Sequence, residues 1–126
     1  MSNDNLDFGR GAEELASRFL KDKGYKIICR NYRTKLGEID IIAEDKNTLC
    51  FVEVKARRTY RFGSPEEAIS GRKKRQISKA ALSFIKDKKL TNRLARFDVV
   101  ALSWDSGFPK IELFKNAFEL SAGYYP

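Results

Sequence analysis

The sequence contains no histidine and only two cysteines among its 126 residues. Zinc fingers, Ser-His-Asp triads and histidine-dependent metal nucleases all require more of these side chains, so these classes are excluded. Cys29 and Cys50 each lie in an apolar, strand-like segment, where a free cysteine behaves as a small buried hydrophobe. We therefore interpret both as reduced core residues and regard a disulfide as the less favoured alternative. Any catalysis must rely on carboxylates, lysine and a recruited metal ion.

Long apolar runs are also missing. No stretch approaches the ~20 residues of a membrane-spanning helix, and the start, Met1–Asp4, lacks the basic and apolar regions of a signal peptide. These two absences predict a cytoplasmic protein with no membrane partner. Repeats, low-complexity tracts and linkers are absent too, and a chain of 126 residues suits one domain. We predict a flexible polar tail over residues 1–8 and a single domain over residues 9–126.

Positive charge is concentrated in one segment. The formal net charge is +8, from 25 basic and 17 acidic residues, and residues 55–79 alone carry nine basic residues against two acidic ones. Clustered lysine and arginine neutralise backbone phosphates, so this cluster predicts nucleic-acid binding. Within it, residues 56–63 interleave arginines with Tyr60 and Phe62, which either stack on bases or anchor the loop to the core. The alternative is a basic surface that serves solubility alone.

Residues 37–55 have the pattern of a β-hairpin with acidic side chains near its open end. Both arms are rich in Ile, Val and Phe, and the polar turn between them centres on Lys46–Asn47. Because side chains alternate with a period of two, a two-residue turn places Asp40 opposite Glu53, with their Cβ atoms about 5 Å apart. A four-residue loop would shift the register by two and place Glu38 opposite Glu53, with the same faces meeting.

Two carboxylates held this close repel each other, so the hairpin requires a compensating charge. A hard divalent ion such as Mg²⁺ supplies it, because this ion takes carboxylate, water and phosphate oxygens as ligands. Lys55 lies opposite Glu38 in the two-residue register, placed to contact the attacking water or the scissile phosphate. The alternative is that Glu53 and Lys55 form only the solvated face of an amphipathic strand. Asp40 between two isoleucines, the Glu-x-Lys pattern and the arginines that follow together favour catalysis.

An amphipathic helix is predicted from Gly9 until Gly24 stops it, with an apolar stripe of Leu15, Ala16, Phe19 and Leu20. Glu13 lies at the edge of the inward face of this helix. A glutamate there needs a partner, either the metal site or a basic residue such as Arg10. Spacing alone favours the ion pair.

A second helical region begins with a capping pattern at Ser64, is interrupted at Ser70–Gly71 and continues to about Lys88. Basic residues in its first turns oppose the helix dipole, an arrangement that suits an expected anion. Asp98 is most simply the ion-pair partner of a neighbouring arginine. The remaining strands are predicted at residues 25–32, 96–102 and 110–114.

The motifs and their order resemble those of a known family. The matching residues are Gly9–Arg10, Glu13–Ala16, Gly37–Ala43, Phe51–Lys55, Lys73 and Arg96–Val100. On these residues the chain resembles the PD-(D/E)XK nuclease superfamily and, closely within it, the YraN family of small bacterial proteins related to archaeal Holliday-junction resolvases. The resemblance implies an α/β fold with a restriction-endonuclease-like core, in which helices flank a mixed central sheet of about five strands in the order α-β-β-β-α-β-β.

The resemblance also implies an active site. In it, Asp40 and Glu53 ligate Mg²⁺ or Mn²⁺ and Lys55 activates or orients water. Glu13 matches the first-helix glutamate that helps to bind metal in the resolvase-like branch, which overturns the preference for an ion pair. Ile39 occupies the place of the motif's proline and touches no ligand. The implied activity is a metal-dependent endodeoxyribonuclease acting on branched or junction DNA in repair or recombination. Because resolvase relatives act as dimers, a homodimer is implied as well.

The residues predicted to contact nucleic acid, with DNA favoured over RNA, are Arg57, Arg58, Arg61, Arg72, Lys73, Lys74 and Gln76. Nothing in the basic loop resembles a base-reading code, so we predict structure-selective rather than sequence-specific binding. A shared fold does not determine function, and two alternatives stay open. One is a noncatalytic nucleic-acid-binding module, and the other is a partner protein of a DNA-processing complex whose basic face meets an acidic protein. The salt dependence of DNA binding separates these two.

Overall fold

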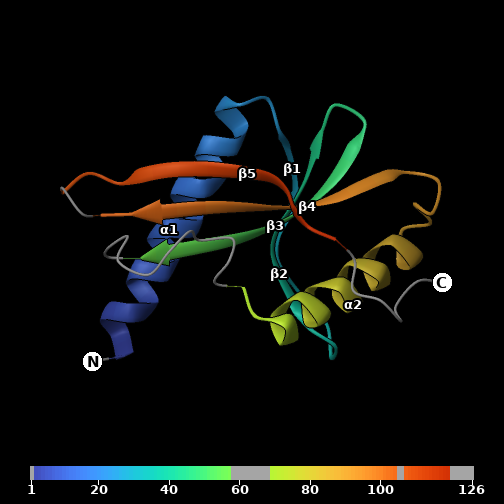
Figure 1. Ribbon diagram of the computed structural model, residues 1–126, viewed down its shortest axis with the longest axis horizontal. Helices are drawn as coiled ribbons and strands as arrows, with labels where there is room; N and C mark the ends of the chain where they lie inside the picture. The colour runs from blue at the N-terminus through green and yellow to red at the C-terminus, as the bar shows by residue number, and fades with distance from the viewer. Residues whose placement is uncertain (1, 58–68, 105–106, 120–126) are drawn as a thin grey trace.

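The computed structural model describes residues 2–57, 69–104 and 107–119, with side chains described from Gly9 onward. Its elements are α1 (Ser2–Asp22), β1 (Lys26–Arg33), β2 (Glu38–Asp45), β3 (Thr48–Arg57), α2 (Gly71–Asp87), β4 (Leu94–Ser103) and β5 (Lys110–Phe118). The chain is an α/β protein, and the predicted order of one helix, three strands, one helix and two strands is confirmed (Figure 1). Among the described residues, neither helix is long and apolar enough to cross a membrane.

The five strands form one mixed sheet in the order β1-β2-β3-β4-β5. β3 and β4 are parallel, and the other three neighbouring pairs are antiparallel. A parallel pair needs a long crossover connection, and α2 lies in that connection. In the β2–β3 hairpin Asp45 pairs with Thr48, so the turn is the two-residue alternative at Lys46–Asn47 and not the four-residue loop. The acidic arm and the Glu-x-Lys arm are therefore direct neighbours at the centre of the sheet.

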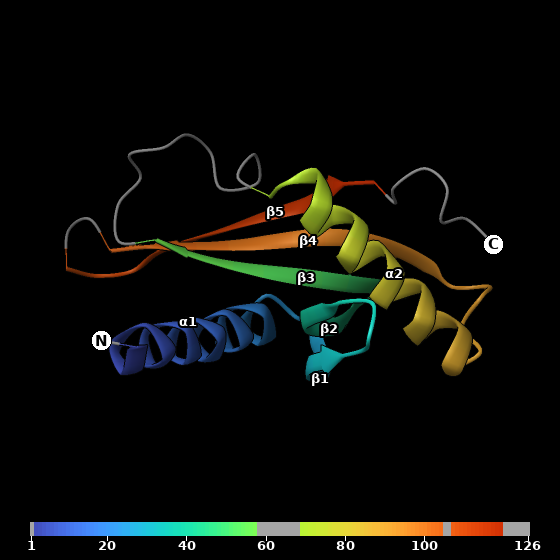
Figure 2. The same cartoon turned by 90° about the horizontal axis from the view of Figure 1, so that it is seen from below.

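The two helices pack against opposite faces of the sheet, each through its own apolar core. Along β3, Leu49 and Phe51 join the core beneath α2, whereas Cys50 and Val52 join the core beneath α1. Successive strand residues point to opposite faces, so a continuous apolar run marks a strand covered on both sides. In Figure 2, α1 lies below β3–β5, and α2 begins on their other side. Both cysteines are free thiols, as predicted, and Cys29 packs against the α2 core.

The first helix is longer than the sequence predicted. It begins at Ser2 rather than at Gly9, so residues 2–8 are helical in the structure. The apolar stripe shows where a helix packs, whereas extending a helix adds one backbone hydrogen bond for each residue fixed and needs no such stripe. The other end is as predicted. Gly24 adopts a φ of +95°, and the Tyr25 amide donates to the Leu20 carbonyl at 2.9 Å, which ends α1.

The second helix begins at Gly71, within the interruption predicted at Ser70–Gly71. Ser70 caps it, because its hydroxyl oxygen accepts a hydrogen bond from the Lys73 amide at 3.1 Å. No acidic residue lies in the first turn, so the positive end of the helix dipole faces further positive charge. The helical start predicted at Ser64 lies outside the described residues.

A buried polar network joins β4 to the hairpin and to β5. The Asp98 side chain is completely buried and accepts hydrogen bonds from Arg96 Nε at 2.9 Å and from the Asn116 amide at 2.9 Å. The Tyr25 hydroxyl donates to the same carboxylate at 3.1 Å, and Arg96 also donates to Asp45 at 2.7 Å. Asp98 is therefore the ion-pair partner of a neighbouring arginine, as predicted.

The connection between β1 and β2 is a tight turn over residues 34–37. The Thr34 hydroxyl oxygen accepts hydrogen bonds from the Leu36 amide at 3.0 Å and from the Gly37 amide at 3.1 Å. The Thr34 amide donates to the Gly37 carbonyl at 2.8 Å. Gly37 also lies against α2, where an added Cβ atom would be only 2.4 Å from the carbonyl oxygen of Gln76. The missing side chain of Gly37 lets this turn approach the helix backbone.

We expect Gly37→Ala to lower the free energy of unfolding by about 1–3 kcal/mol, because the new methyl group has to push two backbones apart. Urea denaturation with a circular-dichroism readout measures this. Gly11→Ala is the matched control, because Gly11 is an exposed α1 residue with open space around its Cβ position. Alanine there should stabilise the helix by about 0.5–1 kcal/mol. Equal stability of the two variants would contradict the close approach of the turn to α2.

Candidate active site

The open end of the β2–β3 hairpin differs from the predicted ladder. The pairing ends at Ile41 with Val52, and one carboxylate oxygen of Asp40 accepts a hydrogen bond from the Val54 amide at 2.8 Å. β2 and β3 diverge here because the Asp40 side chain, and not the β2 backbone, accepts the hydrogen bond from the Val54 amide. Asp40 and Glu53 are therefore neighbours without forming a ladder pair.

Glu38 and Lys55, predicted to be opposed in the two-residue register, are not opposed either, because the β2–β3 pairing ends before it reaches them. Glu38 pairs with Arg33 in the β1–β2 ladder, and their side chains form an ion pair with Nε and Oε1 3.3 Å apart. The strict alternation expected along β2 breaks as well. Ile39 and Ile42 both belong to the core beneath α2, although they are three residues apart. Residues three apart in a regular strand point to opposite faces, so β2 must be locally irregular between Ile39 and Ile42, the segment that contains Asp40.

Glu53 is a buried carboxylate with an incomplete set of partners. Its side chain is 6% exposed, and its Oε2 atom lies 3.6 Å from Nζ of Lys73 on α2. Its Oε1 atom is buried and has no hydrogen-bond partner among the described residues. Burial raises the pKa of Glu53 well above its ordinary value, and the charge of Asp40 and a hydrogen bond with Asp40 raise this pKa further. Lys73 and Lys55 oppose this shift.

Glu13 approaches the same pair from α1. Burial and the negative charge of Asp40 raise the pKa of Glu13, whereas a hydrogen bond with the Asn31 side chain lowers it. Asn31 lies between Arg30 and Tyr32 in β1, at a φ of +54°. An asparagine tolerates this left-handed conformation better than most residues. The adjacent Glu14 forms ion pairs with Arg18 and Arg30, whereas no ion pair of Glu13 occurs among the described residues. The ion pair between Glu13 and Arg10 that spacing favoured is therefore not formed.

The acidic residues supply some, but not all, of the ligands that a divalent cation needs. Within the described residues, no three side chains of His, Cys, Asp or Glu gather closely enough to hold a metal ion by themselves. Asp40 and Glu53 match the one or two carboxylates that usually hold Mg²⁺, with waters and substrate phosphates completing the shell. The unpartnered Glu53 oxygen and the mutual repulsion of the two carboxylates are the features that a bound cation would satisfy.

The predicted nucleic-acid-binding residues separate into groups. Arg72 is exposed in the first turn of α2, next to the likewise exposed Arg75, which was not among the predicted residues, and Arg57 is half-buried at the end of β3. Lys74 lies over the Phe118 ring, with its Nζ atom 5.7 Å from the centroid, so its ammonium group faces β5. Lys73 contacts Glu53 instead of standing apart from the acidic residues. Arg58 and Arg61 lie outside the described residues, and Gln76 lines a polar hollow together with Lys73 and residues 33–38.

Sequence reasoning missed the contact between Lys73 and Glu53 and the position of Asn31 beside Glu13. No local pattern indicates either contact, because each joins different elements. It also missed the basic residues Arg33 and Lys35 next to the site. Their signal was present, since both flank Thr34 immediately before the acidic arm of the hairpin.

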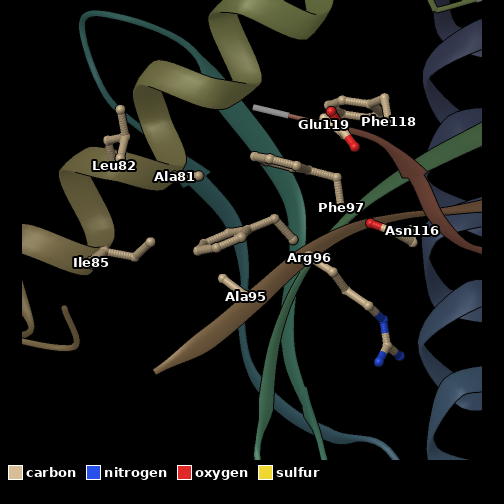
Figure 3. Close-up of a pocket in the computed structure, with 10 residues that line it drawn as sticks. Ala81, Leu82, Ile85, Ala95, Arg96, Phe97, Asn116, Phe118 and Glu119 are labelled. Carbon is tan, nitrogen blue, oxygen red and sulfur yellow. The ribbon is translucent and has the colours of Figure 1, made fainter. Parts of the chain in front are cut away.

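An apolar pocket lies elsewhere, between α2 and the strands β4 and β5. Phe51, Ile85, Phe97 and Phe118 line it. In Figure 3, the guanidinium group of Arg96 points away from these apolar side chains, consistent with its contacts to Asp98 and Asp45. None of the candidate catalytic residues lines this pocket, so the catalytic chemistry predicted for the acidic pair does not involve it.

The amino-acid sequence is similar to those of many known proteins. Residues 12–102 match the uncharacterised protein family UPF0102. A UPF0102 protein of Desulfosudis oleivorans is 52% identical over 119 residues, covering 94% of this chain and 95% of that protein. A UPF0102 protein of Geotalea daltonii is 50% identical over 120 residues, covering 94% of each chain. The matched segment runs from α1 to β4 and includes the acidic pair. Both the family match and these near full-length similarities show that the chain belongs to the UPF0102 family.

Proposed function

We propose that the protein is a metal-dependent nuclease that hydrolyses phosphodiester bonds in DNA, with Asp40, Glu53 and Lys55 in its active site. The observation that carries this proposal is the buried Glu53 carboxylate, which lies beside Asp40 with one oxygen unpartnered. Unsatisfied buried carboxylates are costly, so they are retained where they bind a cation or do chemistry. The motif resemblance to the PD-(D/E)XK nucleases supports the same assignment.

Asp40 and Glu53 would hold Mg²⁺ or Mn²⁺, and Glu13 adds negative charge from α1. A bound ion of this kind supplies a Lewis acid that polarises the phosphate and lowers the pKa of a bound water. The hydrogen bond from the Val54 amide fixes the orientation of the Asp40 carboxylate. Lys55, whose charge already acts on Glu53, would stabilise the negative charge that develops on the phosphate.

The substrate follows from the charge around the acidic pair. Exposed arginines in the first turns of α2 lie on the same helix as Lys73, which contacts Glu53. Such groups bind phosphates without reading bases, so they favour selection of DNA by shape, including branched or junction DNA. On the resemblance to junction resolvases, we also propose that the protein acts as a homodimer in repair or recombination.

Cleavage assays on labelled DNA test the nuclease directly. Duplex, single-stranded, flap and four-way DNA are incubated with Mg²⁺, Mn²⁺ or EDTA. We expect cutting with either metal and none with EDTA, and we expect Glu53→Gln and Lys55→Ala to abolish it. Lys21→Ala is the control, because Lys21 is exposed at the end of α1 and should leave cleavage unchanged. If all four DNA forms are bound but none is cut with either metal, the nuclease proposal fails.

The ion pair between Lys73 and Glu53 supports a second candidate, a noncatalytic nucleic-acid-binding module. Here Lys73 would neutralise Glu53 permanently, and no metal would be needed. Binding to DNA would then be unaffected by Mg²⁺ beyond the screening that any salt produces, and the affinity would fall steeply with salt. If the protein instead binds an acidic protein partner, it should show no DNA binding even at low salt.

A further inference from the structure

Leu36 is an apolar side chain held at a fixed point on the surface. It is 52% exposed at the tip of the 34–37 turn. A single exposed leucine is ordinary in a soluble protein. This one differs because hydrogen bonds to the Thr34 hydroxyl and the close approach of Gly37 to the backbone of α2 hold the turn in place. Such an arrangement presents an apolar contact surface with little conformational entropy to lose on binding.

Positive charge surrounds this leucine. Leu36 borders two hollows on the surface, one lined by Arg33, Lys73 and Gln76 and the other by Lys79, Leu82 and Lys86. Lys35 is its exposed neighbour in the turn. The same hollows contain two acidic residues, Glu38 and Asp87. Glu38 is paired with Arg33 and Lys73 is paired with Glu53, so the five cations still exceed the acidic groups around Leu36. A ligand that matches an apolar point within a cationic ring has an apolar face and several negative charges.

The hollow beside Leu36 shares its lining residue Lys73 with the surroundings of the acidic pair. Lys73 lines this hollow and lies 3.6 Å from Glu53, and Glu38, which also lines it, precedes Asp40 by two residues. A nucleic-acid chain bound along this surface would therefore place a base near Leu36 and its backbone near the acidic pair. Bases inside an intact duplex are stacked and cannot offer a free face. Leucine is among the side chains that proteins insert where a base step is opened.

We propose that Leu36 contacts an unstacked base at a branch, an end or a single-stranded segment of DNA, while the surrounding lysine and arginine side chains hold its phosphates. This inference rests on the proposed nuclease function and deepens it, because it names the feature by which the DNA is selected. Leu36 is a specificity-determining residue here, and Lys35 contributes charge without selectivity.

Binding measurements in EDTA test this proposal without any cleavage. Fluorescence anisotropy compares a plain duplex with a forked duplex that carries 2-aminopurine at the fork. The wild-type protein should prefer the fork and raise the 2-aminopurine fluorescence as the base leaves its stack. Leu36→Ser should reduce the preference about tenfold, because serine loses the apolar contact with the base, and should suppress the fluorescence rise, with duplex binding unchanged. Leu36→Met should retain both effects.

Two further variants serve as controls. Leu94→Ser changes a leucine that is 73% exposed at the start of β4, so it should leave fork preference intact. Lys35→Ala should weaken binding to both DNA forms and reduce the salt slope by about one. The proposal is overturned if Leu36→Ser prefers the fork as strongly as Leu94→Ser does, or if the protein binds neither DNA form. If the fork preference depends on Leu36 but no metal-dependent cleavage occurs, the nuclease proposal is contradicted and the Leu36 proposal is retained.

Discussion

Replacing Asp98 by alanine is expected to lower the free energy of unfolding by about 3–5 kcal/mol, because it leaves a buried ion pair without its anion. The change removes the acceptor of three donors at once, from Tyr25, Arg96 and Asn116. Arg96 would keep its hydrogen bonds to Asp45 and to the Tyr25 hydroxyl. Because domains of this kind are stable by only about 5–15 kcal/mol, this single change removes a large fraction of the total.

Chemical denaturation of the wild type and Asp98→Ala measures this difference. The change should appear as a lower midpoint with an unchanged slope, since both proteins expose the same surface on unfolding. Asp87→Asn is the control, because Asp87 is an exposed aspartate of α2, and its substitution should change the stability by less than about 0.5 kcal/mol. A loss below about 1 kcal/mol for Asp98→Ala would show that the network does not stabilise the fold.

In the absence of divalent metal, Glu53→Gln is expected to stabilise the protein at alkaline pH by about 1–3 kcal/mol. The pKa of Glu53 is raised in the folded state above the ordinary value of 4.5 by burial and by Asp40. The folded protein therefore holds a proton that the unfolded chain has released. This contribution to stability is complete below the unfolded pKa and is lost as the pH rises through the folded pKa. Glutamine has no proton to release, and its amide can donate to Asp40.

Thermal unfolding between about pH 5 and pH 9 in EDTA tests this sign. The melting temperature of the wild type should fall relative to that of Glu53→Gln as the pH rises. Adding Mg²⁺ or Mn²⁺ at alkaline pH should stabilise the wild type by preferential binding to the folded state, and should not stabilise the glutamine variant. Glu119→Gln is the control, because it removes one negative charge at an exposed position and not at a buried one. A wild type that becomes relatively more stable as the pH rises would contradict the burial of an ionisable Glu53 beside Asp40.

Part of the candidate site could be predicted from the sequence because its determinants are local. Asp40 stands between isoleucines, and Glu53 and Lys55 end an apolar strand. A polar two-residue turn sets the distance between the two arms, and the structure has that turn at Lys46–Asn47. The register at the open end could not be predicted. There the Asp40 carboxylate competes with the ladder for the Val54 amide, and side-chain capping of this kind does not follow a period of two.

Turns, caps and hydrophobic periods act over a few residues, so the amino-acid sequence was enough to predict the order of strands and helices and most of their apolar faces. Which distant groups meet depends on tertiary packing. The packing of α2 brought Lys73 to Glu53, and the same helix lies against Gly37 in the 34–37 turn. Strand pairing brought Asn116 to Asp98. Such contacts depend on how whole elements pack, and no local pattern encodes the distance between two side chains on different elements.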